Sequence, residues 1–211
     1  MKIELWMDLV CPYCFLGARH LRLALQELSL WTNVEVQIRA YELDPDRPLY
    51  VGKGLIETLM NKYGITSEEA VENMEEVRQR GAEAGIDFRF GKAKPTNTRD
   101  AHRLIKYAQS EGKAYELSER IFQSYFEEGG LISNHELLLT LVKGVHLDQQ
   151  KAKAVLEDSS FYLEEIHRDE SRGSDLNFDT VPYVLIDDHI IIDDSGTREL
   201  YMEKLIRTQQ T

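Results

Sequence analysis

The chain has 211 residues, 42% of them hydrophobic, and 37 acidic against 25 Lys and Arg side chains give it a formal charge of −12. No apolar run approaches the roughly 20 residues of a membrane helix, and no lysine-rich run is present that would neutralise a phosphate backbone. We therefore expect neither a membrane span nor a nucleic-acid partner. The opening "MKIELWMDLV" is not built like a secretory signal peptide, which predicts a cytoplasmic protein.

The first 43 residues predict a strand, a helix and a second strand. The segment "KIELWMDLV" (2–10) is a short, partly alternating apolar run, typical of a strand. In "FLGARHLRLALQEL" (15–28) the apolar positions recur at helical spacing. The segment "VEVQIRAYEL" (34–43) alternates with period 2 and predicts a strand. One face of that strand carries Val34, Val36 and Ile38.

The middle of the chain has helical character, with glycines closing most segments. The predicted helices cover 54–64, 67–85, 98–112, 114–130, 134–145 and 148–173. In the fourth of these, Leu117, Ile121 and Tyr125 recur every four residues and predict a buried stripe. Strand character returns in 181–187 and 189–193, and a last helix is expected over 195–208.

This order of elements predicts an α/β fold. Strands at both ends of the chain, with helices between them, indicate one sheet assembled from the two ends around an inserted helical domain. We place the sheet domain at 1–43 and 176–211, and the inserted domain at 44–175.

Both cysteines of the chain lie in "DLVCPYCFLG", where the first strand passes into the first helix. A thiolate at the first turn of a helix meets unpaired N–H groups and the positive end of the helix dipole, which favour its charged form. Pro12 suits the first helical position. This placement predicts that Cys11 attacks or is attacked in disulfide exchange, while Cys14, one turn further in and less exposed, resolves the mixed disulfide.

Two other roles for the cysteines are weaker. A structural zinc site takes four ligands, whereas the chain has no third cysteine and no H-x₃₋₅-H pair, so His20, His102 and other histidines would have to complete the set. A structural disulfide across so short a loop constrains the unfolded chain little, and it does not suit a cytoplasmic protein. We expect no metal site, and no G-x-G-x-x-G or P-loop pattern indicates a nucleotide.

Near the other end, "DTVPYVLID" places Pro182 directly before an apolar strand. Together with "CPYC" at a strand-to-helix junction and a helical insertion, this resembles the DsbA branch of the thioredoxin superfamily. The segments "DLVCPYC", "YELDP", "NTRDAHRLIKYA", "GLISNHELLLTLVKGVHLD" and "TVPYVLID" are similar, in order and spacing, to its FrnE-like subgroup.

The resemblance implies a thioredoxin-like fold with a large inserted α-helical domain. It also implies that Pro182 follows a cis peptide bond and faces the cysteines, with Thr180 and Val181 beside it and the backbone of Val181 offered to a substrate peptide or thiol. The subgroup often has Trp where this chain has Tyr13. Its usual "SGAQ"-like turn reads "DDSGTREL" here, where Ser195 and Gly196 match and the rest diverges.

Three further residues are candidates for the site. Asp8 precedes Cys11 by three residues and is either a proton relay for Cys14, or a solvated strand-end acid or helix cap. His102 flanks the expected inward stripe of its helix, formed by Ala101, Leu104, Ile105 and Ala108, and is either a site residue or a packing or surface histidine. Tyr13, between the cysteines, is expected to tune the reduction potential and to line the surface beside Cys11.

These features predict a thiol-disulfide oxidoreductase that acts on a thiol- or disulfide-bearing protein or small molecule. No bound cofactor is expected, and glutathione is a possible reductant, because "CPYC" and "TVPYV" are also pieces of glutaredoxins. One alternative is a glutathione-dependent isomerase or transferase, like the related kappa-class transferases and hydroxychromene-carboxylate isomerases. The other is a chaperone-like binding module in which the thiols are dispensable.

Overall fold

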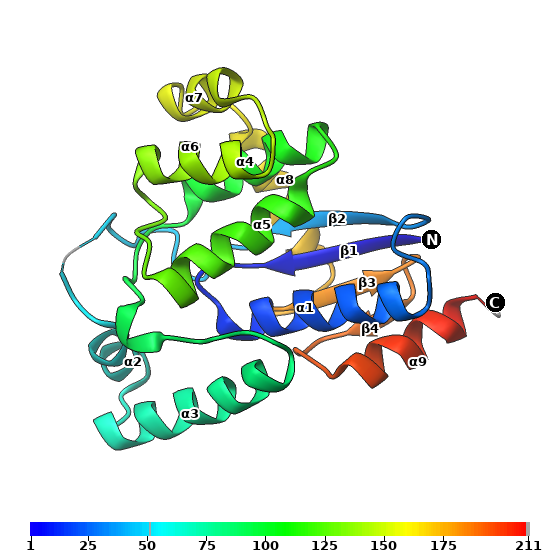
Figure 1. Cartoon of the computed structure of the whole chain (residues 1–211), viewed down its shortest axis with the longest axis horizontal. Coiled ribbons are helices and arrows are strands. Elements are labelled where there is room, and N and C mark those ends of the chain that lie inside the picture. Colours follow the sequence, from blue (N-terminus) through cyan, green and yellow to red (C-terminus); the bar gives the residue numbers. More distant parts are fainter. Residues whose placement is uncertain (51, 210–211) are drawn as a thin grey trace.

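The computed structural model describes residues 1–50 and 52–209. Its centre is a four-stranded sheet in the order β2-β1-β3-β4, in which β1 pairs parallel with β2 and antiparallel with β3, and β3 pairs antiparallel with β4. The two ends of the chain therefore build one sheet, as the sequence predicts (Figure 1). The strands are β1 (Lys2–Met7), β2 (Glu35–Ala40), β3 (Tyr183–Ile186) and β4 (Ile190–Ile192).

Alternation along β1 divides the sheet into two faces. Ile3, Leu5 and Met7 point into the main hydrophobic core together with residues of α1 (Pro12–Glu27) and α9 (Arg198–Thr208). On the opposite face, Trp6 forms a smaller cluster with Tyr183, Leu185 and Phe178. The sheet is thus buried on both sides at its centre, where β3 consists only of buried hydrophobic residues, whereas β2 at the edge alternates with polar residues.

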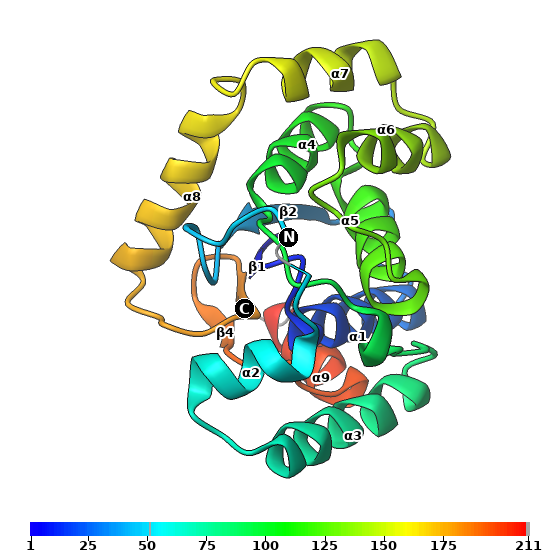
Figure 2. The same cartoon turned by 90° about the vertical axis from the view of Figure 1, so that its left-hand side faces the viewer.

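The inserted segment surrounds the end of the sheet at which β1 passes into α1. Viewed from that end, α2 and α3 lie on one side of the strands and α4 to α7 on the other (Figure 2). The inserted helices are α2 (Leu55–Tyr63), α3 (Ser67–Glu83), α4 (Arg99–Ser110), α5 (Ala114–Gln123), α6 (His135–Gly144), α7 (Gln149–Glu157) and α8 (Leu163–Asp175). No helix in the described residues is both long and apolar enough to cross a membrane.

One core joins the sheet to the insertion. The stripe predicted on 114–130 is buried at Leu117, Ile121 and Tyr125, and the stripe predicted on α4 is buried at all four positions. These residues belong to the same cluster as the apolar residues of β1 and α1. The division of the chain at residues 43 and 175 stays a prediction.

Helix α8 is fixed to the sheet by a buried network of charges. The carboxylate of Asp169 accepts hydrogen bonds from the backbone N–H of Ala40 at 2.8 Å and from Arg39 at 2.8 Å, and it forms an ion pair with Lys106 of α4. The carbonyl of Asp169 accepts the indole N–H of Trp6 at 2.9 Å. Charged groups this deep are stable only because each has partners.

The single helix predicted over 148–173 is wrong, because the chain breaks between α7 and α8. Asp158 accepts hydrogen bonds from the backbone N–H and the hydroxyl of Ser160, which form a turn in place of helix. Arg103 of α4 then binds the carbonyls freed by the break, those of Val155, Asp158 and Phe161. A distant side chain therefore stabilises the interruption.

Other boundaries shift less. The first strand ends at Met7 rather than residue 10, and the first helix begins at Pro12 rather than residue 15. The helix predicted over 114–130 passes into a π-helical turn, Ser124–Glu128, which the hydrophobic periodicity does not reveal. A short 3-10 turn, Phe90–Lys92, was not predicted.

Candidate active site

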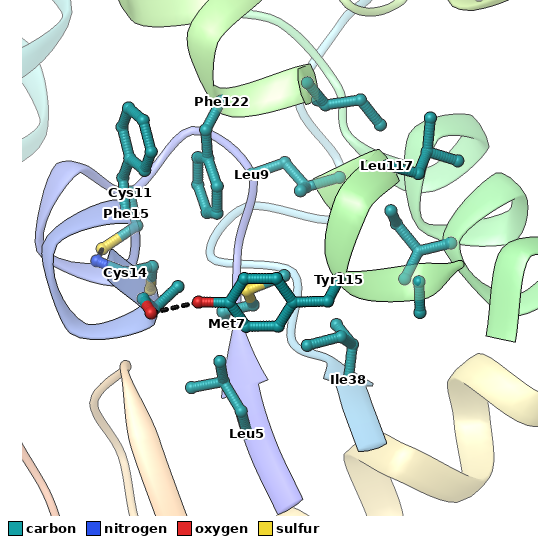
Figure 3. Packing of buried hydrophobic residues seen from close by; sticks show 14 of the residues in the cluster. Leu5, Met7, Leu9, Cys11, Cys14, Phe15, Ile38, Tyr115, Leu117 and Phe122 are labelled. Atoms are coloured by element: carbon teal, nitrogen blue, oxygen red, sulfur yellow. Dashed lines mark hydrogen bonds between the residues drawn. The ribbon is translucent and has the colours of Figure 1, made fainter. Parts of the chain in front are cut away.

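Cys11 is the residue at which α1 begins. Its backbone is extended, and its Sγ accepts the backbone N–H of Cys14 at 3.3 Å, so the sulfur occupies the place of an N-capping oxygen. Pro12 holds the first helical position, as predicted. Figure 3 shows Cys11 and Cys14 at the edge of the hydrophobic core, with the stacked rings of Phe15 and Phe122 nearby.

The second thiol, Cys14, lies wholly within the protein, whereas Cys11 keeps 6% of its surface exposed. Burial raises the pKa of Cys14 well above its usual range, and the hydrogen bond and charge of the Cys11 sulfur act in the same direction. Both thiols are free. Cys14 therefore holds its proton at neutral pH and needs a base before it can attack.

The residues before β3 lie directly against the cysteine motif. The Val181–Pro182 peptide bond is cis, as the resemblance implies. The Cys11 thiol lies 3.7 Å from the carbonyl oxygen of Val181. Gly17 permits this approach, because a Cβ there would lie 3.0 Å from Cγ of Pro182. Thr180 is exposed, and no side-chain hydrogen bond holds it among the described residues.

Asp8 is buried, so the expectation of a solvated strand-end acid is wrong. It is not the helix cap either, because Cys11 takes that position. One carboxylate oxygen accepts the backbone N–H of Leu43 at 2.8 Å, and the other lies 3.4 Å from Nε2 of His102. The negative charge of Asp8 adds to the raised pKa of Cys14, whereas a hydrogen bond with the Asp8 backbone acts to lower it.

His102 comes to this acid from the inserted segment. It lies in the first turn of α4 and is 1% exposed, so the expectation of a surface histidine is wrong. Its second ring nitrogen, Nδ1, is buried and has no hydrogen-bond partner among the described residues. The structure therefore brings together Cys11, Cys14, Asp8, His102 and Pro182 from three separate stretches of the chain.

A cleft of about 370 Å³ opens at Cys11. Its rim includes Pro12 and Tyr13, and Tyr13 is 38% exposed. Helices α2 and α3 supply its far wall, and α2 has no fully buried residue because its apolar side faces this opening. Apolar side chains that line the cleft include Val10, Leu43, Leu55, Leu59, Val77 and Phe90.

Sequence reasoning missed the cations around this opening. Arg47 and Lys62 line the cleft, and the guanidinium of Arg80 on α3 lies over the ring of Tyr13, 5.8 Å from its centroid. Nothing in the local sequence marks Arg80, because its partners are far along the chain. No group of three or more His, Cys, Asp or Glu side chains in residues 1–50 and 52–209 is arranged to hold a metal ion.

Known proteins share this architecture. The DSBA-like thioredoxin domain family matches residues 2–202. The uncharacterised protein YwbO of Bacillus subtilis (strain 168) is 25% identical over 213 residues, which cover 100% of this chain and 98% of YwbO. The structure of the probable DsbA oxidoreductase SCO1869 from Streptomyces coelicolor superposes with a TM-score of 0.92 at 27% identity, covering 100% of this chain and 90% of that one.

A more distant structure has the same fold. The cytosolic disulfide reductase DsbM from Pseudomonas aeruginosa, also solved with GSH, superposes with a TM-score of 0.71 at 17% identity and covers 100% of this chain and 99% of its own. At that identity the likeness shows the fold alone. The family match, by contrast, spans nearly the whole sequence, and the protein therefore belongs to the family of DsbA-like thioredoxin-domain proteins.

Proposed function

We propose that the protein is a thiol-disulfide oxidoreductase that uses Cys11 and Cys14 as its redox pair. The observation that carries this proposal is the placement of two free thiols in the first turn of α1, one at the mouth of a cleft and one buried behind it. A pair of this kind separates the role of attack from the role of resolution.

The reaction begins at the accessible thiol. The Cys11 thiolate attacks one sulfur of a substrate disulfide, the substrate S–S bond breaks, and the first thiolate leaves and takes up a proton. Cys14 then loses its proton and attacks Sγ of Cys11, which releases the second substrate thiol. Two electrons pass from the protein dithiol to the substrate, and the protein is left with a Cys11–Cys14 disulfide.

Asp8 is the base that this second step needs. Its carboxylate is buried, its charge acts on the pKa of Cys14, and it is held by the N–H of Leu43, so it has a fixed position and no bulk water to compete with it. His102, 3.4 Å away, orients the carboxylate as a positioning residue. The pair supplies a proton acceptor for Cys14 in the reductive direction and a donor in the oxidative one.

The surface around Cys11 receives the substrate. Pro12 and Tyr13 form one rim of the cleft, while half-buried Val181, with exposed Thr180 before it and buried Pro182 after it, lies beside the Cys11 sulfur. A low-molecular-weight thiol such as glutathione returns the disulfide to the dithiol, and no bound cofactor is required. In the cytosol, whose glutathione poise lies at about −220 to −320 mV, a pair with a DsbA-like potential is held reduced and acts as a reductase or isomerase.

The test is reduction of a protein disulfide, such as those of insulin, by the wild type and by Cys11→Ser and Cys14→Ser, with glutathione as the reductant. We expect Cys11→Ser to be inactive and Cys14→Ser to accumulate a mixed disulfide visible by mass spectrometry. The chain has no other cysteine, so every thiol signal belongs to this pair.

Two outcomes would replace the proposal. Full turnover of a small molecule by Cys14→Ser with bound glutathione would indicate a glutathione-dependent isomerase or transferase. Equal suppression of aggregation by the wild type and by a variant without either cysteine, together with no disulfide exchange, would indicate a chaperone-like binding module.

A further inference from the structure

Arg80 brings a guanidinium to the side of the cysteine motif. It lies on α3 one turn after Val77, which lines the cleft. Its Nη2 donates to Oγ of Ser195 at 2.5 Å and to the carbonyl of Gly196 at 3.4 Å, and its Cζ stands 5.8 Å from the centre of the Tyr13 ring. The side chain is therefore held between the loop before α9 and Tyr13, one of the two residues that separate the cysteines.

This guanidinium has unused binding capacity. Among residues 1–50 and 52–209, Arg80 forms no ion pair, and its Nε and Nη1 have no hydrogen-bond partner. Three nearby arginines do have carboxylate partners. Arg19 and Arg22 of α1 bind Glu119, and Arg78 of α3 binds Glu75. Glu76, whose charge raises the pKa of Tyr13, is not within ion-pair distance of Arg80.

Such an arrangement is unusual in a chain with 37 acids and 25 Lys and Arg residues. A half-buried cation normally acquires a carboxylate when acids are abundant, and Arg binds carboxylates through two parallel N–H groups. Arg80 itself does not line the cleft but lies beside Tyr13 at its rim. Of the two cations that line the cleft, Lys62 of α2 has no ion pair in the described part of the chain and adds to the positive potential, while Arg47 is neutralised by Asp44 at 2.8 Å.

We propose that Arg80 binds a carboxylate of the substrate while the substrate sulfur is at Cys11. The inference rests on the proposed function and names its substrate class: disulfides with an apolar body, which the cleft walls contact, and a carboxylate a few bonds from the sulfur. That chemistry occurs in small acidic disulfides and in polypeptides with an acidic residue next to cysteine. Arg80 is thus a specificity-determining residue for the exchange reaction.

The experiment compares substrates that differ only in charge. The protein, kept reduced by glutathione, reacts under multiple turnover with 3,3′-dithiodipropionic acid and with its neutral diamide, and kcat/KM above the uncatalysed rate is obtained for the wild type, Arg80→Gln and Arg80→Lys. We expect Arg80→Gln to lower kcat/KM for the diacid by about tenfold through a higher KM, and to change the diamide less than about twofold. Arg80→Lys keeps part of the preference because it keeps the charge.

Arg78→Gln is the matched control, because Arg78 lies on the same helix, is exposed and, among the described residues, forms its ion pair and side-chain hydrogen bonds with Glu75 of the same helix. It is expected to leave both substrates unaffected. A pair of short cystine peptides with Asp or Asn beside the cysteine distinguishes the polypeptide source from the small-molecule source. Equal losses on diacid and diamide would overturn the inference, as would no loss on either. Reduction of insulin but of neither compound nor either peptide would overturn this inference alone, and reduction of none of them would remove the proposed function as well.

Discussion

The two thiols have different environments although only two residues separate them. Cys11 ends the connection from β1 and touches the cleft, while Cys14 has turned inward with the helix and lies in the main hydrophobic core. Desolvation disfavours a charged sulfur. The buried thiol of Cys14 therefore stays protonated, whereas the more accessible thiol of Cys11 meets the substrate. This difference in burial, rather than a difference in sequence, assigns the order of the two steps.

Alkylation measures this difference directly. At pH 7 we expect iodoacetamide to add one label, at Cys11, and to leave Cys14 unmodified, because burial raises the pKa of Cys14. Peptide mapping by mass spectrometry identifies the labelled residue, and the protein unfolded in urea, which takes two labels, is the control. Labelling of Cys14 before Cys11 in the folded protein would contradict the assigned order.

Asp8→Asn removes the proposed base with little change of shape. The Asn carbonyl oxygen still accepts the N–H of Leu43, so the fold is retained. We expect resolution of the mixed disulfide by Cys14 to slow by about 100-fold, the lower end of what general acid-base groups contribute. Rapid-quench mass spectrometry follows the step. An unchanged rate of resolution would remove Asp8 from the mechanism.

Helix α8 and strand β2 are joined through ionic groups that local sequence does not pair. The side chain of Asp169 is only 2% exposed. Its carboxylate forms ion pairs with Arg39 and Lys106 and accepts a hydrogen bond from a backbone N–H. Burial lowers the pKa of Lys106, an effect that the charge of Asp169 opposes. Among the described residues, Lys106 has no other carboxylate, whereas Arg39 also binds Glu4.

Asp169→Asn should therefore destabilise the fold, because it leaves Lys106 buried without its counter-charge. We expect the free energy of unfolding to fall by about 3 kcal/mol, in the range found when one partner of a buried ion pair is removed. Urea denaturation gives the value. Lys153→Gln, which breaks an exposed pair with Glu157, is the control and should change the stability little. Equal effects of the two substitutions would show that the network is not a stabilising contact.

Sequence periodicity predicted the helices and strands that bury one of their faces. The stripe at Leu117, Ile121 and Tyr125 and the alternation in β2 follow from one-sided burial, which leaves a regular pattern. The break between α7 and α8 depends on Arg103, which is more than 50 residues away in the chain and binds carbonyls rather than side chains. Periodicity contains no information on such contacts, and the helix was therefore predicted to continue.

The candidate site shows the same limit. The cysteines and Pro182 were predicted from their motifs, but Asp8 and His102 were placed only as alternatives, because their burial results from tertiary packing. Arg80 was not predicted at all, since it reaches Tyr13 and Ser195 only once α3 folds back over the start of α1. The sequence motifs identify the reacting groups of the site, but they do not identify the groups that surround them.

Across the whole molecule, carboxylates hold the two ends of the chain to the insertion. Glu4 of β1 is almost wholly buried and binds Arg39 of β2 and Arg172 of α8. Burial opposes its ionisation, but the hydrogen bonds from Arg172 and Arg39 outweigh it, and the pKa of Glu4 is lowered below 4.5. The ionised form is thus the one that stabilises the fold.

The sign of the pH dependence follows from that lowered pKa. The contribution of Glu4 is complete above about pH 4.5, the value of the unfolded chain, and it is lost as the pH falls through the lower pKa of the folded protein. We expect Glu4→Gln to cost about 2 kcal/mol of unfolding free energy at pH 7. The difference from the wild type should shrink at pH 3, as measured by urea denaturation. A difference that is the same at both pH values would contradict this account.

The central claim is that Cys11 and Cys14 form a reversible redox pair. The measurement that tests it is equilibration of the protein in glutathione redox buffers of graded potential, with the fluorescence of Trp6 as the signal and mass spectrometry to count free thiols. We predict one two-electron transition between the dithiol and an intramolecular Cys11–Cys14 disulfide, reached from both directions. If no intramolecular disulfide forms at any potential, or if a stable glutathione adduct on Cys11 takes its place, the account is contradicted.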